Sequence, residues 1–211
     1  MKRIAFLIDG FNVYHSTLAI QTNTRQRTKW LNLGSLCSSY VSLWGKDANV
    51  VEIFYFSAPP YYLEAKDPHK ITRYETYLRC LRATGITIEL ARFKPKEVYC
   101  DSCRTLIIKH EEKETDVAIA VRTMEMFVHD RADVAVIVSS DTDFAPVVYT
   151  CSRLFPAKSI IFAFPYARKN EELAHIAKGS FSIGRRQYLK HQLPNPFVLA
   201  DGTEIEKPLS W

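Results

Sequence analysis

The chain has 211 residues, which is long enough for one well-packed α/β domain with a small appendage, and its 47% hydrophobic and 24% charged residues are ordinary values for a globular protein. It carries 28 Lys and Arg against 23 Asp and Glu, and this net charge of +5 suits a nucleic-acid partner without requiring one. Asp9 interrupts the apolar run near the N-terminus and no stretch is long enough to span a membrane, which excludes a signal peptide and a membrane protein and favours a soluble, cytoplasmic one.

Apolar runs alternate with helical patterns along the first half of the chain. Runs rich in β-branched and aromatic residues predict strands at 3–8, 50–57 and 86–93. Apolar residues spaced three or four apart predict helices at 13–20, 33–43 and 69–84, whereas the polar run 21–29 predicts an exposed loop.

The second half continues this alternation after an insert at 94–109 that we expect to form a small hairpin. Strands are predicted at 134–139 and 159–164, and helices at 113–128, 144–154 and 171–177. The helix at 113–128 has a predicted core stripe of Val117, Ala120, Val121, Met124 and Phe127. Strands alternating with helices predict a three-layer α/β sandwich with a mainly parallel sheet.

Acidic residues follow two of these strands. Asp9 ends the first strand, Asp141 and Asp143 follow the fourth, and Asp116 opens the helix that leads into the fourth. If the first and fourth strands are neighbours, the four carboxylates converge at one edge of the sheet. Like charges so close together need a cation among them, and Mg²⁺ or Mn²⁺ prefers carboxylate and water oxygens.

Three polar residues of this region have two interpretations each. Asn12 and Ser139 suit a site that holds waters or phosphate oxygens, but they also suit a turn and a strand-end hydrogen bond, respectively. Asp116 is also a favourable first-turn residue of a helix, because the macrodipole stabilises a negative charge there.

Three motifs, in this order and spacing, resemble the NYN domain, in the LabA (DUF88) branch of the PIN-like nucleases. They are Asp9-Gly-Phe-Asn12, Lys113-x-x-Asp116 and Ser139-x-Asp141-x-Asp143-Phe144. The resemblance extends to Asn170-Glu-Glu-Leu173, to Gln192-Leu-Pro, and to the closing pattern Asp201-Gly-x-x-Ile-x-Lys-Pro-x-x-Trp211.

The resemblance implies a five-stranded PIN-like sheet in the order 3-2-1-4-5 and an acidic Mg²⁺ or Mn²⁺ site for RNA cleavage. The implied acids are Asp9, Asp116, Asp141 and Asp143, with Asn12 and Ser139 beside them, so no acid of the pattern is missing. We expect residues 1–190 to form the NYN/PIN-like domain, with an insert near 94–110, and residues 191–211 to form an extended C-terminal tail packed on it.

The leading functional hypothesis is a metal-dependent endoribonuclease in which a metal-activated water hydrolyses RNA phosphodiesters. A haloacid-dehalogenase-like phosphatase would need an acid/base Asp two residues after Asp9, where this chain has Phe11. A third hypothesis is a non-catalytic NYN module that binds RNA or a protein partner in a regulatory role.

The insert contains a possible second metal set, Cys100, Cys103 and His110. Two thiolates and an imidazole can begin a tetrahedral structural Zn²⁺ site, and the sequence leaves the fourth ligand open. Cys80, His69 or, in a homodimer, a residue of a second chain would complete it, whereas the alternative is a pair of unliganded thiols. The five cysteines are otherwise too few and too scattered for a disulfide scaffold.

Three basic clusters are candidate phosphate contacts for an RNA partner, and each also suits a solvated surface. They are Arg25, Arg27 and Lys29; Arg92, Lys94 and Lys96; and Arg185, Arg186 and Lys190. Aromatic residues near them would stack on unpaired bases: Trp30, Phe93, Tyr99 and Tyr188.

Overall fold

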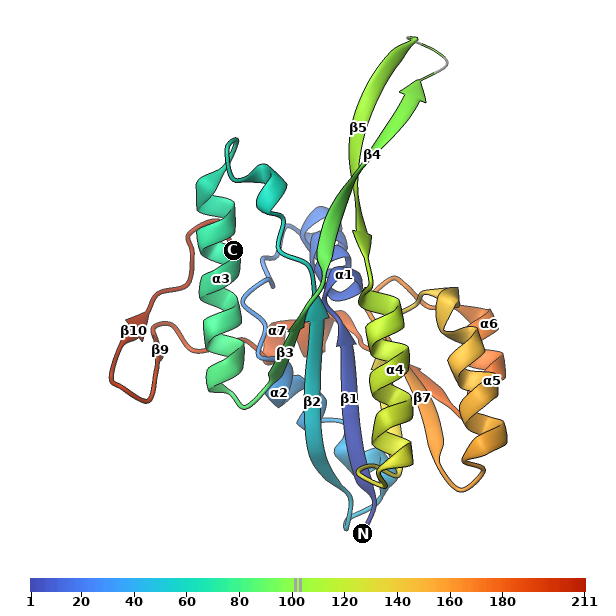
Figure 1. The fold of residues 1–211 in the computed structure, drawn as a ribbon. Helices are drawn as coiled ribbons and strands as arrows, with labels where there is room; N and C mark the ends of the chain where they lie inside the picture. The colour runs from blue at the N-terminus through green and yellow to red at the C-terminus, as the bar shows by residue number, and fades with distance from the viewer. Residues whose placement is uncertain (101, 103) are drawn as a thin grey trace.

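The computed structural model describes residues 1–100, 102 and 104–211. In this part of the chain a central sheet of six strands has the order β3-β2-β1-β6-β7-β8, with every neighbouring pair parallel (Figure 1). Its strands are β1 (Arg3–Asp9), β2 (Asn49–Ser57), β3 (Thr87–Leu90), β6 (Val134–Val138), β7 (Ser159–Phe164) and β8 (Ser180–Ser182). The predicted α/β class with a parallel sheet is confirmed.

The predicted five-stranded order 3-2-1-4-5 is not matched, because the described sheet has six strands and ends at β8. Strand β8 has only three residues, Ser180 to Ser182, which is too short to show an apolar period in the sequence. It is recognisable only from its parallel pairing with β7, where Phe162 lies opposite Ser180.

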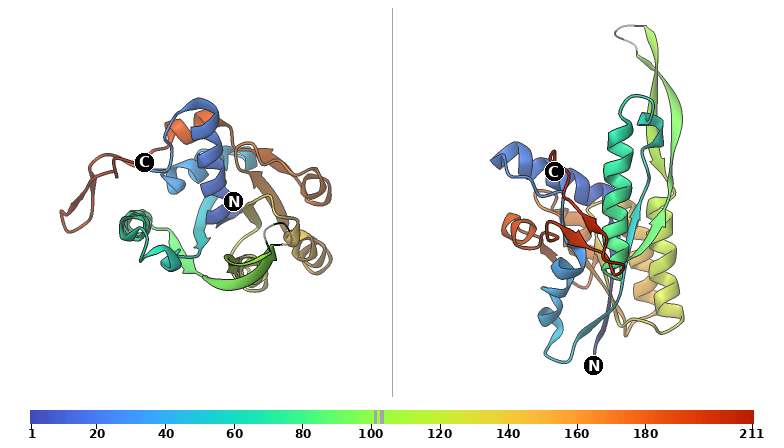
Figure 2. Two further views of the ribbon diagram at one scale, coloured as in Figure 1. Left: turned by 90° about the horizontal axis from the view of Figure 1, so that it is seen from above. Right: turned by 90° about the vertical axis from the view of Figure 1, so that its left-hand side faces the viewer.

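Helices cover both faces of the sheet (Figure 2). One face carries α1 (Gly10–Thr24), α2 (Leu33–Ser38), α3 (Pro68–Ala83) and α7 (Arg185–Lys190), and the other carries α4 (Thr115–Val128), α5 (Ala145–Leu154) and α6 (Glu171–Ile176). Short 3₁₀ turns lie at η1 (Val41–Trp44), η2 (Tyr61–Leu63) and η3 (Thr142–Phe144). None of the helices described is long and apolar enough to cross a membrane.

The alternation of side chains along β1 divides the core into two halves. Ile4, Phe6 and Ile8 pack into the cluster under α1, α2 and α3, whereas Ala5 and Leu7 pack into the cluster under α4 and α5. All five side chains are at most 1% exposed, so β1 is buried on both faces, as expected of a central parallel strand. This burial fixes the position at which Asp9 leaves the strand.

The predicted core stripe of α4 is wrong at two of its positions. Val117 and Val121 are 67% and 59% exposed, and the buried side chains of the helix are Thr115, Ile119, Thr123, Met126 and Phe127. Apolar residues occupy more than one face of this helix, so its period alone does not select the buried one.

The insert is a long two-stranded hairpin of β4 (Arg92–Cys100) and β5 (Thr105–Lys113), which forms a separate antiparallel sheet. It extends well beyond the central sheet in Figure 1, and its base leads directly into α4. The predicted third strand, 86–93, is divided between β3 and the beginning of β4.

The C-terminal residues run over the face that carries α1 and α3, and they include the small hairpin β9 (Phe197–Val198) and β10 (Glu204–Ile205). Trp30 Nε1 donates a 3.0 Å hydrogen bond to the carbonyl oxygen of Pro194. The indole of Trp211 packs edge-on against Trp30 and Tyr77, with ring centroids 6.1 and 5.5 Å apart. The end of the described chain is therefore tied to the domain by aromatic contacts.

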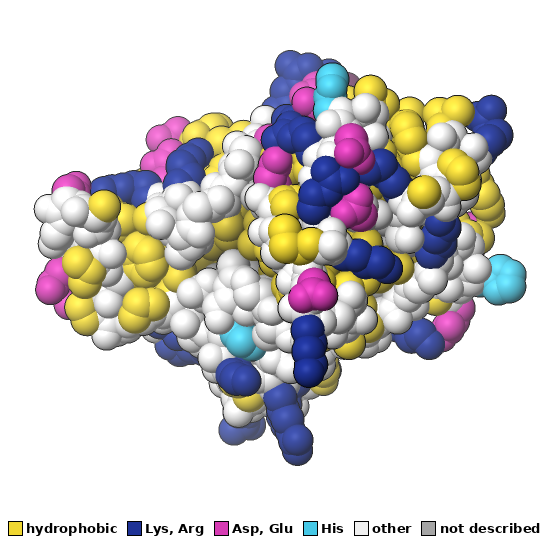
Figure 3. All heavy atoms as spheres, turned by 90° about the horizontal axis from the view of Figure 1, so that it is seen from below, with side chains coloured by type: hydrophobic (Ala, Val, Ile, Leu, Met, Phe, Trp, Pro, Cys, Tyr) yellow, Lys and Arg dark blue, Asp and Glu magenta, His cyan; other side chains and the backbone are white. Residues whose placement is uncertain are grey.

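The face at which β1 begins carries interspersed positive and negative side chains (Figure 3). At the start of β1, Arg3 forms a bidentate contact with Asp133, with Nη2–Oδ1 and Nε–Oδ2 distances of 2.6 and 3.1 Å. Lys158 and Asp130 extend this network. These ion pairs tie the first residues of β1 to the loops before β6 and β7, at the edge opposite the acidic residues.

Candidate active site at the C-terminal edge of the sheet

The carboxylate of Asp9 lies almost completely buried at the end of β1. Its Oδ2 accepts hydrogen bonds of 2.8 Å from both the Ser139 hydroxyl and Asn12 Nδ2, and its Oδ1 accepts one of 2.9 Å from the Asn12 backbone N–H. Burial raises the pKa of Asp9, these three donors oppose that shift, and the nearby charge of Asp141 adds to it. Asp9 is thus held in one orientation as the N-cap of α1.

Gly10 allows this tight turn from β1 into α1. A Cβ atom at this position would lie 2.5 Å from Tyr55 Cζ and 2.8 Å from the carbonyl oxygen of Phe56, both on β2. Helix α1 can therefore begin directly after Asp9 only because no side chain separates its first residue from β2.

Asn12 connects Asp9 to two further loops at this edge. While its Nδ2 donates to Asp9, its Oδ1 accepts 2.8 Å from the Ser140 hydroxyl and 2.7 Å from Arg168 Nε. Asn170, the N-cap of α6, donates a 3.1 Å hydrogen bond to the backbone oxygen of Ser140. The ends of β1, β6 and β7 are consequently joined by side-chain hydrogen bonds.

The loop after β6 places two more carboxylates at the edge. The Asp141 backbone N–H donates to the Ser139 hydroxyl at 3.2 Å, and Asp141 Oδ1 caps η3 by accepting from the Asp143 backbone N–H at 3.1 Å. Asp141 is half-buried and Asp143 is exposed. The predicted strand-end hydrogen bond of Ser139 and its proximity to Asp9 are therefore both present.

Asp116, in the first turn of α4, faces the same group of acids. Burial raises its pKa to about 6, with further increases from the charges of Asp9, Asp141 and Asp143. Burial likewise raises the pKa of Glu112 to about 7, where Asp9 and Asp116 add to the shift and a hydrogen bond from the Thr115 hydroxyl opposes it. The five carboxyl groups therefore share one electrostatic environment.

The chemistry of this donor set fits a hard divalent cation. Carboxylate, amide and hydroxyl oxygens are the ligands that Mg²⁺ and Mn²⁺ prefer. A cation would offset both the burial and the mutual repulsion that raise the pKa values of Asp116 and Glu112. In the described residues, however, no three His, Cys, Asp or Glu side chains are grouped closely enough to hold an ion as they stand. Water molecules would therefore have to supply part of the coordination, as they commonly do around Mg²⁺.

Two charged residues at this edge were not identified as site residues from the sequence. Glu112 lies on β5, before the predicted helix, and only the fold of the hairpin brings it toward Asp9. Arg168 lies after β7, and no ion pair of its guanidinium with a carboxylate occurs in the part of the chain that is described. The sequence pattern that could have identified Arg168 as a site residue is its position shortly after a parallel strand. Lys113, unlike Arg168, is in an ion pair: its ammonium lies 3.0 Å from a carboxylate oxygen of Glu111 on the hairpin.

The predicted zinc set does not come together as proposed. In the hairpin register Cys100 lies opposite Thr105, whereas His110 lies opposite Pro95, five positions along the ladder. This separation corresponds to roughly 17 Å, too far for the two side chains to share an ion. The ring of His110 instead stacks on Tyr62, with centroids 4.0 Å apart. Cys103 lies outside the described residues.

The predicted aromatic contacts to RNA have different outcomes. Trp30 and Tyr188 are fully buried, so the prediction that they stack on bases is wrong. Both belong to the core, and the Tyr188 hydroxyl shares a 2.6 Å hydrogen bond with Ser16. Tyr99 is exposed on the hairpin, and Phe93 lines a pocket beside α1.

The family of the chain follows from comparison with known proteins. The NYN domain family matches residues 3–183, and the chain therefore belongs to this family. NYN domains are part of the PIN-like nuclease superfamily, which suggests a nuclease role. The LabA (DUF88) branch stays a prediction.

A solved structure supports the fold. The crystal structure of a protein of unknown function from Vibrio parahaemolyticus is similar to this chain with a TM-score of 0.55 and 19% identity, covering 86% of this chain and 93% of that one. This similarity concerns the fold alone. No curated protein matches the chain.

Proposed function

We propose that the protein is a metal-dependent endoribonuclease whose active centre is the acidic edge formed by Asp9, Asp116, Asp141 and Asp143. The observation that supports it is the buried carboxylate of Asp9, held by three hydrogen bonds and facing other carboxylates whose pKa values are raised. Holding several carboxylates so close together costs free energy unless a cation binds among them. The carboxylates would hold Mg²⁺ or Mn²⁺, which would lower the pKa of a bound water and neutralise charge on a phosphate.

We assign different roles in cleavage to the residues around Asp9. Asn12 and Ser139 fix the orientation of Asp9 through their 2.8 Å hydrogen bonds, so its carboxylate is already oriented before a metal binds. Arg168 is oriented by Asn12 at 2.7 Å and carries a positive charge beside the acids. We assign it the role of stabilising charge on the phosphate, for which a guanidinium is well suited.

An asparagine substitution tests the proposal. Asp141→Asn removes one carboxylate charge and retains an acceptor for the Asp143 backbone N–H, so we expect loss of Mn²⁺-dependent cleavage of single-stranded RNA with the fold intact. Asp9→Asn is the second variant. Asp47→Asn, at an exposed position just before the start of β2 and so at the other end of the sheet, is the control. Full cleavage by either site variant would contradict the assignment.

A non-catalytic NYN module that binds RNA or a protein partner is the second candidate. The observation that favours it is that no three ligand side chains of the described chain are grouped around a common point. Calorimetry with Mn²⁺ and an RNA degradation assay, done on the same preparation, distinguish the two. Mn²⁺ binding without cleavage of any RNA would favour the module.

A further inference from the structure

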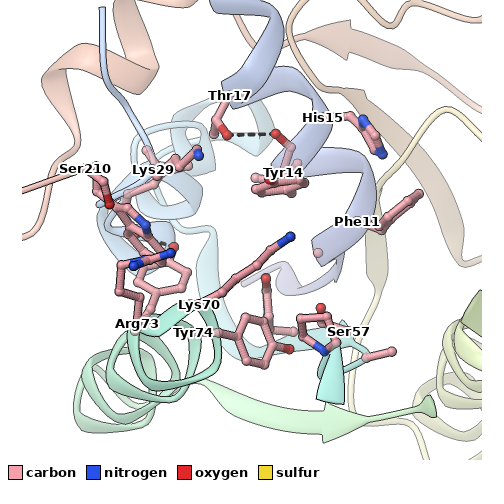
Figure 4. Close-up of a pocket in the computed structure, with 18 of the residues that line it drawn as sticks. Phe11, Tyr14, His15, Thr17, Lys29, Ser57, Lys70, Arg73, Tyr74 and Ser210 are labelled. Carbon is pink, nitrogen blue, oxygen red and sulfur yellow. Dashed lines mark hydrogen bonds between the residues drawn. The ribbon is translucent and has the colours of Figure 1, made fainter. Parts of the chain in front are cut away.

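A pocket of about 470 Å³ opens beside α1, between this helix, α3 and the end of β2 (Figure 4). Its walls are rich in aromatic rings, among them those of Tyr14, Tyr55, Tyr62, Tyr77, Phe93 and Trp211. The rings come from six separate elements or loops, so the pocket depends on the complete fold. Its volume lies within the range of small-ligand sites.

Positive side chains line the same pocket. Figure 4 shows Lys70 extending across it toward Tyr14, with Lys29 and Arg73 on the side nearest Ser210. The ammonium of Lys29 lies 5.4 Å from the centroid of the Tyr14 ring. Burial lowers the pKa of Lys29, and the charges of Lys70, Arg73 and Arg27 lower it further. These cations therefore repel one another.

The positive charge of the pocket is only partly balanced. Arg73 pairs with Asp67 at 3.3 Å, and Asp67 is the one carboxylate side chain among the described residues of the lining. Lys29 and Lys70 are in no ion pair within the described chain. An anion bound between them would relieve the repulsion, and a phosphate would accept hydrogen bonds from both.

The pocket is adjacent to the acidic edge. Gly10 and Phe11, which directly follow Asp9, are part of its wall, as is His15 one turn further along α1. His15 is close enough to both Arg168 and Asp9 for their charges to act on its imidazole. A chain that enters the pocket can therefore continue past the first turn of α1 to the acids.

We propose that this pocket holds one unpaired nucleotide, with its base among the aromatic rings and its phosphate at Lys29 and Lys70. Stacking on rings accepts any base, and cations bind the backbone without reading sequence. That this nucleotide belongs to an RNA undergoing cleavage rests on the proposed function. An acidic peptide would satisfy the cations but would leave the rings without a flat partner.

Isothermal titration calorimetry with adenosine 5′-monophosphate tests the pocket without metal or cleavage. We expect the wild-type chain to bind this probe at least about tenfold more tightly than adenosine or ribose 5-phosphate, because each lacks one half of the interaction. Equal binding of ribose 5-phosphate and the nucleotide would overturn the role of the rings, and absence of binding would overturn the proposal.

Two variants separate the phosphate from the base. Lys70→Gln should weaken nucleotide binding about tenfold, because a charge-assisted hydrogen bond is lost, while adenosine binding stays the same. Lys66→Gln is the matched control, since Lys66 is exposed and lies outside the pocket. Tyr14→Ala should weaken nucleotide binding about tenfold without changing that of ribose 5-phosphate. Unchanged nucleotide binding in Lys70→Gln and Tyr14→Ala would contradict the assignment.

The test of nucleotide binding in the pocket does not depend on whether the protein cleaves RNA. If wild-type protein cleaves RNA with Mn²⁺ but does not bind the nucleotide, the pocket proposal fails and the proposed function stands. If it binds the nucleotide, binds it about tenfold more weakly as Lys70→Gln and cleaves no RNA, the proposed function fails and the pocket stands. Competition of the nucleotide with a single-stranded RNA pentamer, and not with a duplex, identifies RNA as the source of the nucleotide; failure to compete would overturn that identification.

Discussion

The hydroxyl of Ser139 donates a 2.8 Å hydrogen bond to Oδ2 of Asp9, which joins two residues 130 positions apart in the chain. They are neighbours because β1 and β6 pair in parallel, with Ile8 opposite Val138, so both strands end at the same edge. The same hydroxyl accepts from the Asp141 backbone N–H at 3.2 Å. The Ser139 hydroxyl thereby fixes the side chain of Asp9 and the backbone of Asp141.

We expect Ser139→Ala to destabilise the fold and to slow cleavage. Asp9 would lose one of its three donors in a fully buried position, at a cost of about 1 to 2 kcal/mol in the free energy of unfolding. Cleavage should fall by about tenfold, because the orientation of Asp9 and Asp141 is loosened. Urea unfolding and a Mn²⁺-dependent RNA assay measure the two effects. Ser182→Ala, at an exposed serine of β8, is the control, and equal stability of the two variants would contradict this role.

The positions of the main acids were predictable because they depend on few assumptions. A run of apolar β-branched residues identifies β6 as a buried strand, and a parallel strand presents the residues after it at the C-terminal edge. Asp9 and Asp141 follow from this rule and from the pairing of β1 with β6. The hydrogen bonds that hold Asp9 were not predictable, because they depend on side-chain orientation.

Residues contributed by irregular or inserted segments were harder to predict. Glu112 belongs to an antiparallel hairpin that lies outside the central sheet, so strand-end reasoning gives it no position. Trp30 looked like an exposed aromatic residue because its neighbours in sequence are basic, yet the C-terminal residues cover it. Val117 and Val121 looked buried because hydrophobicity alone does not show which face of α4 meets the sheet.

Arg168 provides a test of charge placement beside the acids. Arg168→Lys keeps the positive charge but removes the Nε donor that bonds Asn12 Oδ1 at 2.7 Å. We expect RNA cleavage to fall about tenfold with little change in stability, because a lysine cannot be oriented in the same way. Steady-state cleavage kinetics with Mn²⁺ measure this. Arg153→Lys, at an exposed position of α5, should leave the rate unchanged. A rate for Arg168→Lys equal to that of this control would exclude the proposed role.

The ion pair at the start of β1 gives a prediction for acid stability. Hydrogen bonds from Arg3 lower the pKa of Asp133 from 3.8 to about 2. Because the folded-state pKa is depressed, the stabilisation is present above the unfolded value and is lost as the pH falls toward 2. Asp133→Asn should therefore reduce the free energy of unfolding at neutral pH by about 1 kcal/mol, after allowance for solvent screening.

The difference between Asp133→Asn and the wild-type chain should shrink below the unfolded value of 3.8 and disappear as the pH falls through the folded-state value, about 2. Chemical unfolding followed by circular dichroism over this acid range measures it. Asp47→Asn, which removes an exposed carboxylate, is expected to have the same pH dependence of stability as the wild-type chain. A difference that persists in acid would show that the charge of Asp133 is not its cause.

Glu112 gives the opposite dependence on pH. Its folded-state pKa is raised from 4.5 to about 7, so ionisation disfavours the fold and stability is lost as the pH rises between these values. Glu112→Gln keeps an acceptor for the Thr115 hydroxyl and removes the charge, so in a chelating buffer at about pH 8 we expect it to be more stable than the wild-type chain by about 1 kcal/mol, after discount for exposure. At about pH 4 the two should be equal, because Glu112 is then protonated in the folded state and largely so in the unfolded state. Thermal unfolding at both pH values, with Glu64→Gln as the exposed control, measures this difference. Equal stability at the higher pH would show that neither burial nor the charges of Asp9 and Asp116 disfavour ionised Glu112.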